Sequence, residues 1–301
     1  MVQKVFANAK TSDLLVIGAH YGRGMQLKPR YGTAPILSFA PSADTPALAV
    51  SRQARRLLRT VSSLSPQQWT APTRCDDWSV RDVISHLVTT NGFWSYSLDE
   101  GLRGEPSSLL ANFDPVHTPP LLVSASKALT SDEILEQFRA SVELWDSQLA
   151  ALSDEQWYSV AEAPPGHIGV REIAAHSLWD CATHERDIAI PLGLTVTNEP
   201  DEIAWSVKYV AALGPAFLAT EGSTREALLT FSLNEPELAF TVEVGSTVVV
   251  RDRRASDPQP LITGSAVAVL EGLSCRAPLP SVPATQRWML EGLTAVFEAN
   301  S

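Results

Sequence analysis

One stretch of this chain decides its fold: residues 170–190 read VREIAAHSLWDCATHERDIAI. Its apolar residues recur at helical spacing, and it contains neither proline nor glycine, so it predicts a helix. Positions four apart lie on one face of a helix, and His176, Asp180 and His184 therefore share one stripe. An imidazole beside a carboxylate on rigid backbone can hold a divalent cation. The same pattern also occurs on solvated helix faces, so this stretch alone leaves both interpretations open.

A second histidine occurs in a similar setting nearly a hundred residues upstream. Ser79 is a favourable N-cap and Asp82 completes a capping box, which predicts a helix from Val80 to about Leu98. Within that helix His86 lies on the apolar face and points towards the other helices. A lone inward histidine is more often a satisfied core residue than a ligand. His86 therefore needs a partner before it indicates a metal site.

Two more helices complete a bundle. Apolar periodicity predicts them over residues 46–64 and 131–149. With the two helices above, they favour an up-and-down four-helix bundle, because the connections between them are short to moderate. Ligand sites in such bundles lie in the core between facing helices, which is where two helices could bring their histidines together.

The pattern changes after residue 198. A helix is predicted over 202–219, and β-rich segments then follow over 227–233, 238–244 and 247–251, separated by turn residues. Further helices are predicted over 264–273 and 284–299. This is the pattern of a small α+β domain.

We therefore predict an α+β protein in three parts. Prolines at positions 35, 41 and 46 indicate a linker that leads into the bundle. The parts are an N-terminal extension (1–45), of which a portion is expected to be disordered, a helical bundle (46–198), and a smaller C-terminal α/β domain (199–301).

Composition excludes several classes of function. The chain has 301 residues, of which 45% are hydrophobic and 19% charged, as in ordinary globular proteins. Its net charge of -11 repels a phosphate backbone, so we expect no nucleic-acid partner. No apolar run approaches the roughly 18 residues of a membrane span. The three cysteines form no CxxC pair and suit a reducing compartment. We expect a cytoplasmic monomer or homodimer.

Three stretches of the chain resemble one family, the mycothiol-dependent maleylpyruvate isomerases, which belong to the wider DinB-like bundles. The first is WTAPTRCDDWSVRDVISHL over residues 69–87, and the second is the pattern Asp-x-x-x-His-x-x-Asp over residues 180–187. The third, within residues 261–276, is similar to the family's sterol-carrier-like C-terminal domain. The resemblance covers about residues 45–300 and implies a DinB-like bundle followed by that domain.

The resemblance also implies a metal site. In the family the metal, usually zinc, is held by the histidine of the first motif and by a glutamate and a histidine four apart on the later helix. These positions are His86, Asp180 and His184 here. Asp180 replaces the usual glutamate, and a shorter carboxylate must lie closer to the ion. His176, one turn earlier, and Asp187, which suits an acceptor for an imidazole N–H, are left open as further members of the site.

The function implied by the family follows from thiol chemistry. Mycothiol binds as a metal-bound thiolate and attacks an electrophile, while an arginine of the C-terminal motif serves catalysis; this position is Arg276, with Arg251 as a weaker candidate. Because of the N-terminal extension and Asp180, we predict an S-transferase or thiol-exchange enzyme of secondary metabolism, acting on a small electrophilic metabolite or S-conjugate. The alternatives are a mycothiol-dependent maleylpyruvate cis-trans isomerase, a thiol-independent metal hydrolase and a non-catalytic ligand-binding module.

Overall fold

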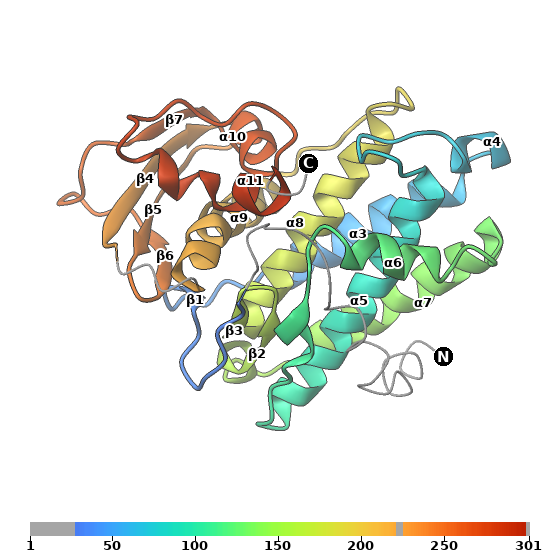
Figure 1. Ribbon diagram of the computed structural model, residues 1–301, viewed down its shortest axis with the longest axis horizontal. Helices are drawn as coiled ribbons and strands as arrows, with labels where there is room; N and C mark the ends of the chain where they lie inside the picture. Colours follow the sequence, from blue (N-terminus) through green and yellow to red (C-terminus); the bar gives the residue numbers. More distant parts are fainter. Residues whose placement is uncertain (1–27, 221–224, 299–301) are drawn as a thin grey trace.

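The computed structural model describes residues 28–220 and 225–298, and four long helices form a bundle in it (Figure 1). Each helix lies where the apolar periodicity predicts it. The α5 helix begins at the predicted capping box, in which the Ser79 side chain accepts from the Asp82 backbone N–H and the Asp82 side chain from the Ser79 N–H. The long helices are α3 (Ala47–Ser62), α5 (Val80–Leu102), α7 (Ser131–Ala150) and α8 (Val170–Ala189).

The order of the helices in space differs from their order in the chain. Both α3 and α5 pack against α7 and α8, so α3 and α5 occupy opposite corners of the bundle. Long connections allow this arrangement, because a chain that crosses the end of a bundle can reach the far corner. The connections carry α4 (Pro66–Trp69), η2 (Leu109–Asn112), α6 (Thr118–Ser124), η3 (Gln156–Tyr158) and an antiparallel hairpin of β2 (Val160–Ala163) and β3 (Gly166–Gly169).

The C-terminal unit is a five-stranded sheet with helices packed on it. The strand order is β1-β6-β5-β4-β7, with antiparallel pairs in the middle and a parallel pair at each edge. The α9 helix (Pro200–Thr220) packs against β5 and β6, against α10 and α11, and against α8 of the bundle. The other elements of this unit are β1 (Leu37–Phe39), β4 (Ala227–Asn234), β5 (Leu238–Val244), β6 (Val248–Asp252), β7 (Ile262–Ser265), α10 (Ala266–Leu273), η4 (Arg287–Met289) and α11 (Glu291–Glu298).

The prediction of a linker around residues 35–46 is wrong for the central part of that segment. Residues 37–39 form β1, which pairs in parallel with β6, Leu37 opposite Val248. Leu37 and Phe39 are buried while Ser38 is half-buried, the alternation of an edge strand. Prolines flank the strand instead of interrupting it, which an edge position permits. Residues 1–27 of the predicted extension lie outside the described residues, and the division of the chain at residues 45 and 198 stays a prediction.

The end of the chain also differs from the prediction in detail. The helix predicted from residue 264 begins at Ala266, because Ile262–Ser265 pairs with β4 as strand β7. The closing helix predicted over 284–299 begins only at Glu291, after a short 3-10 turn. The four-residue strand β7 is too short for periodicity to separate a strand from the first turn of a helix.

Two apolar cores meet on the α8 helix. One cluster runs from the sheet into the bundle and includes Phe231, Trp94 and Leu178. The other fills the remaining part of the bundle and includes Phe138 and Cys181. Leu178 and Cys181 flank Asp180, so the predicted metal carboxylate lies at the junction of the two cores.

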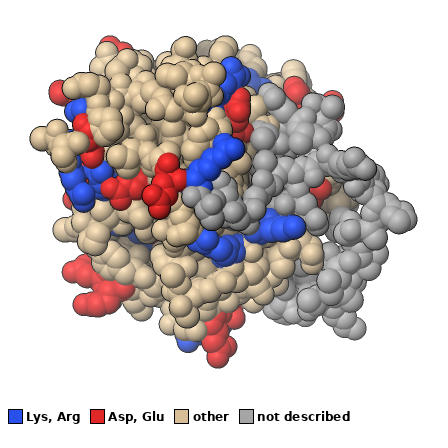
Figure 2. Space-filling view, turned by 60° about the vertical axis from the view of Figure 1, so that its left-hand side comes forward, with Lys and Arg blue, Asp and Glu red and all other residues tan. Residues whose placement is uncertain are grey.

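The surface in Figure 2 shows acidic and basic side chains close to one another among other residues, with no extended basic area on the described part of that face. None of the described helices is long and apolar enough to cross a membrane. The predicted absence of a nucleic-acid partner and the cytoplasmic location stay predictions.

Candidate metal centre

The α5 and α8 helices lie side by side and run in opposite directions. Because each helix repeats a face every four residues, three side chains of α5 meet three of α8 in successive pairs. The pairs are His86 with His184, Thr90 with Asp180, and Trp94 with His176. The structure therefore brings together all three metal ligands that the family resemblance implies.

The candidate metal-binding atoms come from His86 and His184 of the first pair and from Asp180 of the middle pair. Asp180 Oδ1 lies 3.8 Å from His86 Nε2 and 3.4 Å from His184 Nε2. Thr90 Oγ1 donates to Asp180 Oδ2 at 3.3 Å, which leaves Oδ1 directed at the two imidazoles. Tetrahedral ligands about 2.1 Å from a zinc ion lie roughly 3.4 Å apart. The three side chains thus fit a divalent cation, and the shorter carboxylate reaches both histidines.

The charges around this cluster favour a cation. Burial alone would raise the pKa of Asp180, but the facing imidazoles of His184 and His86 outweigh it and hold that pKa well below its usual range. Burial alone would lower the pKa of His184, yet Asp180 and Asp187 raise it well above its usual value. A proton and a divalent cation therefore compete for the same ring nitrogen.

Asp187 orients His184 from the opposite side. Its Oδ2 lies 3.1 Å from His184 Nδ1, and the carboxylate is completely buried. Arg276 donates to both oxygens at 2.9 and 2.8 Å, and Arg74 donates to Oδ1 at 3.1 Å. Burial opposes ionisation, but His184 and Arg276 hold the pKa of Asp187 far below its usual range. An ionised Asp187 accepts a hydrogen bond from the Nδ1–H of His184. The lone pair of the imidazole is then on Nε2, the nitrogen near Asp180.

The arginines on Asp187 are anchored by the C-terminal unit. Glu271 of α10 accepts from Arg74 at 2.7 and 3.3 Å and also pairs with Arg186 of α8. Arg276, the predicted catalytic arginine, follows the same helix and lies beside the site, engaged with Asp187. The weaker candidate Arg251 lies in the sheet on β6 and pairs with Asp257 instead, so the structure does not bring it to the cluster.

Sequence reasoning assigned no role to two neighbours of the histidines. Cys75 Sγ donates to Asp187 Oδ2 at 3.1 Å and lies 3.6 Å from His184 Nδ1. The Trp78 ring packs 5.2 Å from His86 and 6.4 Å from His184, between ring centroids. Both residues belong to the loop before α5, whose course the sequence does not specify. Thr90, by contrast, was detectable, because it follows His86 by one helical turn.

Cys75, His184 and Asp187 also lie close enough to share a cation. Two guanidinium groups, from Arg74 and Arg276, already bind Asp187, and Arg276 Nη2 lies 3.5 Å from Cys75 Sγ. Their positive charge opposes a second positive ion there. The cluster of His86, Asp180 and His184 is therefore the better cation site.

His176 does not join the ligand atoms around Asp180. Its Nδ1 lies 2.5 Å from the Tyr209 hydroxyl, and its ring packs among the rings of Trp94, Trp179 and Tyr209. Burial lowers its pKa to about 4, with a smaller opposing effect from Asp180. His176 is therefore a neutral imidazole one turn from the candidate site.

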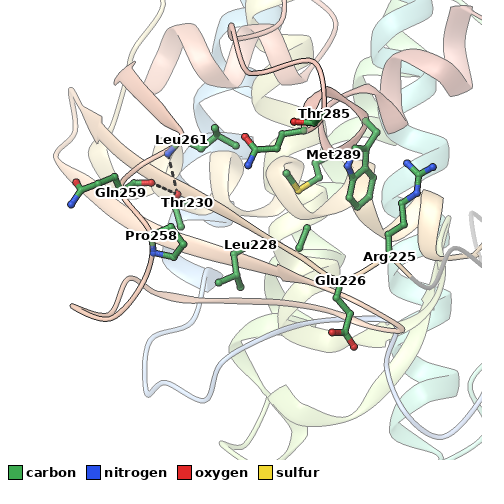
Figure 3. A pocket seen from close by; sticks show the side chains of 12 residues that line it. Arg225, Glu226, Leu228, Thr230, Pro258, Gln259, Leu261, Thr285 and Met289 are labelled. Carbon is green, nitrogen blue, oxygen red and sulfur yellow. Dashed lines mark hydrogen bonds between the residues drawn. The ribbon is translucent and has the colours of Figure 1, made fainter.

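A separate pocket of about 620 Å³ opens in the C-terminal unit (Figure 3). Leu228 and Thr230 of β4 line it together with Gln259 and Trp288, and the Arg225 guanidinium lies 5.5 Å from the centre of the Trp288 ring. Thr230 is satisfied by bonds to the neighbouring backbone. The residues lining this pocket include none of the candidate ligands.

Comparison with known proteins gives one family model and two structures of similar fold. A family model described as the mycothiol maleylpyruvate isomerase N-terminal domain matches residues 50–189, which contain all three candidate ligands. A crystal structure of the mycothiol-dependent maleylpyruvate isomerase is similar at 16% identity and a TM-score of 0.54, covering 79% of this chain and 93% of that one. A mutant of that isomerase gives 15% identity and a TM-score of 0.53, covering 77% and 88%.

At such identities the two structures establish the fold alone, a four-helix bundle with a sheet domain. No curated protein matches the chain. Residues 50–189, which form the helical bundle, match the model of the mycothiol maleylpyruvate isomerase N-terminal domain, and the similar structures share the fold of the chain.

Proposed function

We propose that the protein is a metal-dependent enzyme that uses mycothiol to isomerise maleylpyruvate or a closely similar cis-unsaturated electrophile. The observation that carries the proposal is the convergence of His86, Asp180 and His184 between α5 and α8. The family match and the similar structures support mycothiol as the thiol and isomerisation as the reaction, ahead of the S-transfer that we expected from the sequence.

The donor types explain why a thiol would react here. Two imidazoles and one carboxylate would hold a divalent cation, such as zinc, with net positive charge, and the bound cation would lower the pKa of a thiol towards neutrality. Asp187 fixes the tautomer of His184, and Thr90 fixes the orientation of the Asp180 carboxylate. These contacts hold the ligands in place before the thiol arrives.

The chemistry on the substrate balances without any further reagent. Addition of the thiolate to one carbon of the double bond leaves a single bond, and the negative charge passes to the conjugated carbonyl oxygen. Rotation about that single bond and expulsion of the thiolate then give the trans double bond. The thiol is regenerated, so it is needed only in catalytic amounts.

Arg276 is the residue proposed to meet the substrate's carboxylate. Its Nε and Nη2 are occupied by Asp187, whereas Nη1 makes only a 3.4 Å contact with the Ser274 carbonyl. Burial alone would lower its pKa, but Asp187 raises it, and the guanidinium stays charged. A cationic group beside the reacting atoms suits an anionic substrate.

A thiol-panel assay tests this function. Zinc-loaded protein is incubated with maleylpyruvate and either mycothiol, glutathione or no thiol, and the trans isomer and the free thiol are both quantified. We expect many turnovers for each mycothiol molecule and none without thiol. Stoichiometric loss of thiol into an adduct would indicate S-transfer instead, and turnover without thiol would indicate a hydrolase.

Two matched variants accompany the assay. His86→Ala removes a candidate ligand and should abolish turnover. His117→Ala removes a histidine of the loop before α6 that pairs with Asp114, and it should leave turnover unchanged. Equal activity of both variants would refute a role for the cluster.

A further inference from the structure

The third pair between α5 and α8 contains two polar side chains in an apolar setting. Trp94 is 3% exposed and His176 is 7% exposed, and their ring centroids are 4.5 Å apart. Among the described residues the Trp94 indole N–H has no hydrogen-bond partner. A buried donor without an acceptor costs free energy, so such a group calls for an explanation.

The proton on His176 can be assigned from its partner. The Tyr209 hydroxyl is completely buried, and within the described chain its hydrogen bond is to His176 Nδ1. A buried phenol must donate its proton to avoid leaving it unsatisfied, and Nδ1 is the acceptor that this bond provides. Neutral His176 therefore carries its own proton on Nε2, which makes Nε2 a donor.

Both donors lie beside the candidate metal centre. His176 precedes Asp180 by one turn of α8, and Trp94 follows Thr90 by one turn of α5. The rings of Trp179 and Tyr209 enclose His176 further and limit its contact with water.

We propose that Trp94 and His176 bind an oxygen of the electrophile, as two N–H donors one helical turn from the metal ligands. The ligand class is a small planar molecule whose double bond is conjugated to a carbonyl or carboxylate group. Tyr209 acts through His176 as a positioning residue. This inference rests on the proposed function and names the part of the site that receives the substrate's oxygen.

The reaction explains why neutral donors suit this position. Addition of a thiolate to a conjugated double bond places negative charge on the carbonyl oxygen, and fixed N–H groups stabilise that charge without delivering a proton. A protonated imidazole would repel the cation nearby and could trap the intermediate by protonating it. Aromatic rings around the donors strengthen the hydrogen bonds by excluding water.

Binding and kinetics can be measured on the same variants. Trp94→Phe keeps the aromatic ring and removes the N–H. His176→Gln keeps an acceptor for the Tyr209 hydroxyl but replaces the rigid ring that directs the Nε2–H with a flexible amide. Zinc-loaded proteins are titrated calorimetrically with maleate, a non-reacting cis dicarboxylate probe, without any thiol. We expect each variant to bind maleate about tenfold to a hundredfold more weakly. Its zinc content should match that of the unchanged protein.

The matched control is Trp145→Phe. The Trp145 indole N–H donates to Ser177 Oγ at 3.0 Å, so this variant loses an equally buried indole N–H away from the ligand face. It should bind maleate as the unchanged protein does. Tyr209→Phe removes only the hydroxyl, and it should weaken maleate binding less than His176→Gln does, because His176 can then adopt either tautomer.

The steady-state parameters give a second readout. In the isomerisation assay Trp94→Phe and His176→Gln should lower kcat/KM for the electrophile while KM for mycothiol stays unchanged. Unchanged maleate affinity in both variants, or an equal loss in Trp145→Phe, would overturn the proposal. If maleate binding falls as expected but no isomerisation occurs in any protein, the oxygen site stands and the proposed reaction fails.

Discussion

Two histidines on one helix show how far the surroundings decide the role of a side chain. His184 and His176 lie on the same face of α8, two turns apart, and are 8% and 7% exposed. His184 faces Asp180 and Asp187, which raise its pKa well above the usual value although burial alone would lower it. His176 faces aromatic rings, and burial lowers its pKa to about 4. Equal burial therefore gives opposite charge preferences.

The difference assigns the two residues to different chemistry. An imidazole among carboxylates attracts a cation, whether a proton or a metal ion, and so suits a ligand. An imidazole among aromatic rings stays neutral and suits a hydrogen-bond donor.

The largest effect is expected from removing His184 itself. His184→Ala deletes one of the three proposed ligands and leaves Asp180 and Asp187 without the imidazole that lies between them. Zinc should be absent after dialysis, and turnover should fall to background. Elemental analysis of purified protein checks this, with His117→Ala as a control that keeps its zinc. Full zinc occupancy in His184→Ala would place the metal elsewhere.

The pH dependence of stability separates the two histidines. Below pH 6.5 the unfolded chain binds a proton at His176, whereas the folded protein resists it until about pH 4. The free energy of unfolding should therefore fall by about 3 kcal/mol as pH drops across that interval. In metal-free protein the contribution of His184 to stability depends on pH in the opposite sense. Its pKa is raised, so this contribution is present below pH 6.5 and is lost only at higher pH.

Urea unfolding of the metal-free protein and of metal-free His176→Gln, at pH 7 and at pH 4.5, measures the contribution of His176 to the free energy of unfolding. The difference between the two proteins should shrink or reverse at the lower pH, since the variant lacks the buried group that resists protonation. A difference that does not depend on pH would mean that His176 is not held neutral by burial.

A smaller effect is expected at the carboxylate behind His184. Asp187→Asn keeps the size of the side chain but loses the charge that holds Arg74, Arg276 and the imidazole. Metal affinity should fall about tenfold to a hundredfold. Competition with a coloured chelator measures it. Asp257→Asn, which breaks the buried pair with Arg251 in the sheet, is the control and should leave metal affinity unchanged.

The smallest effect is expected from Thr90, which forms a hydrogen bond with Asp180. Thr90→Val removes the 3.3 Å hydrogen bond to Asp180 and keeps the shape of the side chain. A single hydrogen bond contributes about 1 kcal/mol, so metal affinity should weaken by no more than about tenfold. The chelator competition used for Asp187→Asn also measures this change. A loss as large as that of His184→Ala would show that Thr90 itself is essential to the site.

Some of the site was predictable because helical spacing is a local property. The stripe of His176, Asp180 and His184 follows from residues four apart, and the start of α5 follows from the cap at Ser79. The three candidate ligands were implied by the family resemblance, and the structure brings them together. The strand at residues 37–39 was missed because its partner, β6, lies more than two hundred residues away.

The sequence by itself determined the bundle, the sheet domain and the face of each helix that carries polar residues, because periodicity and capping act over a few residues. Only the tertiary structure decided that His86 meets His184, that Arg276 binds Asp187, and that His176 is enclosed by Trp94 and Tyr209. Those contacts join segments distant in the chain, and the charge of a buried imidazole depends on which neighbours the fold brings to it.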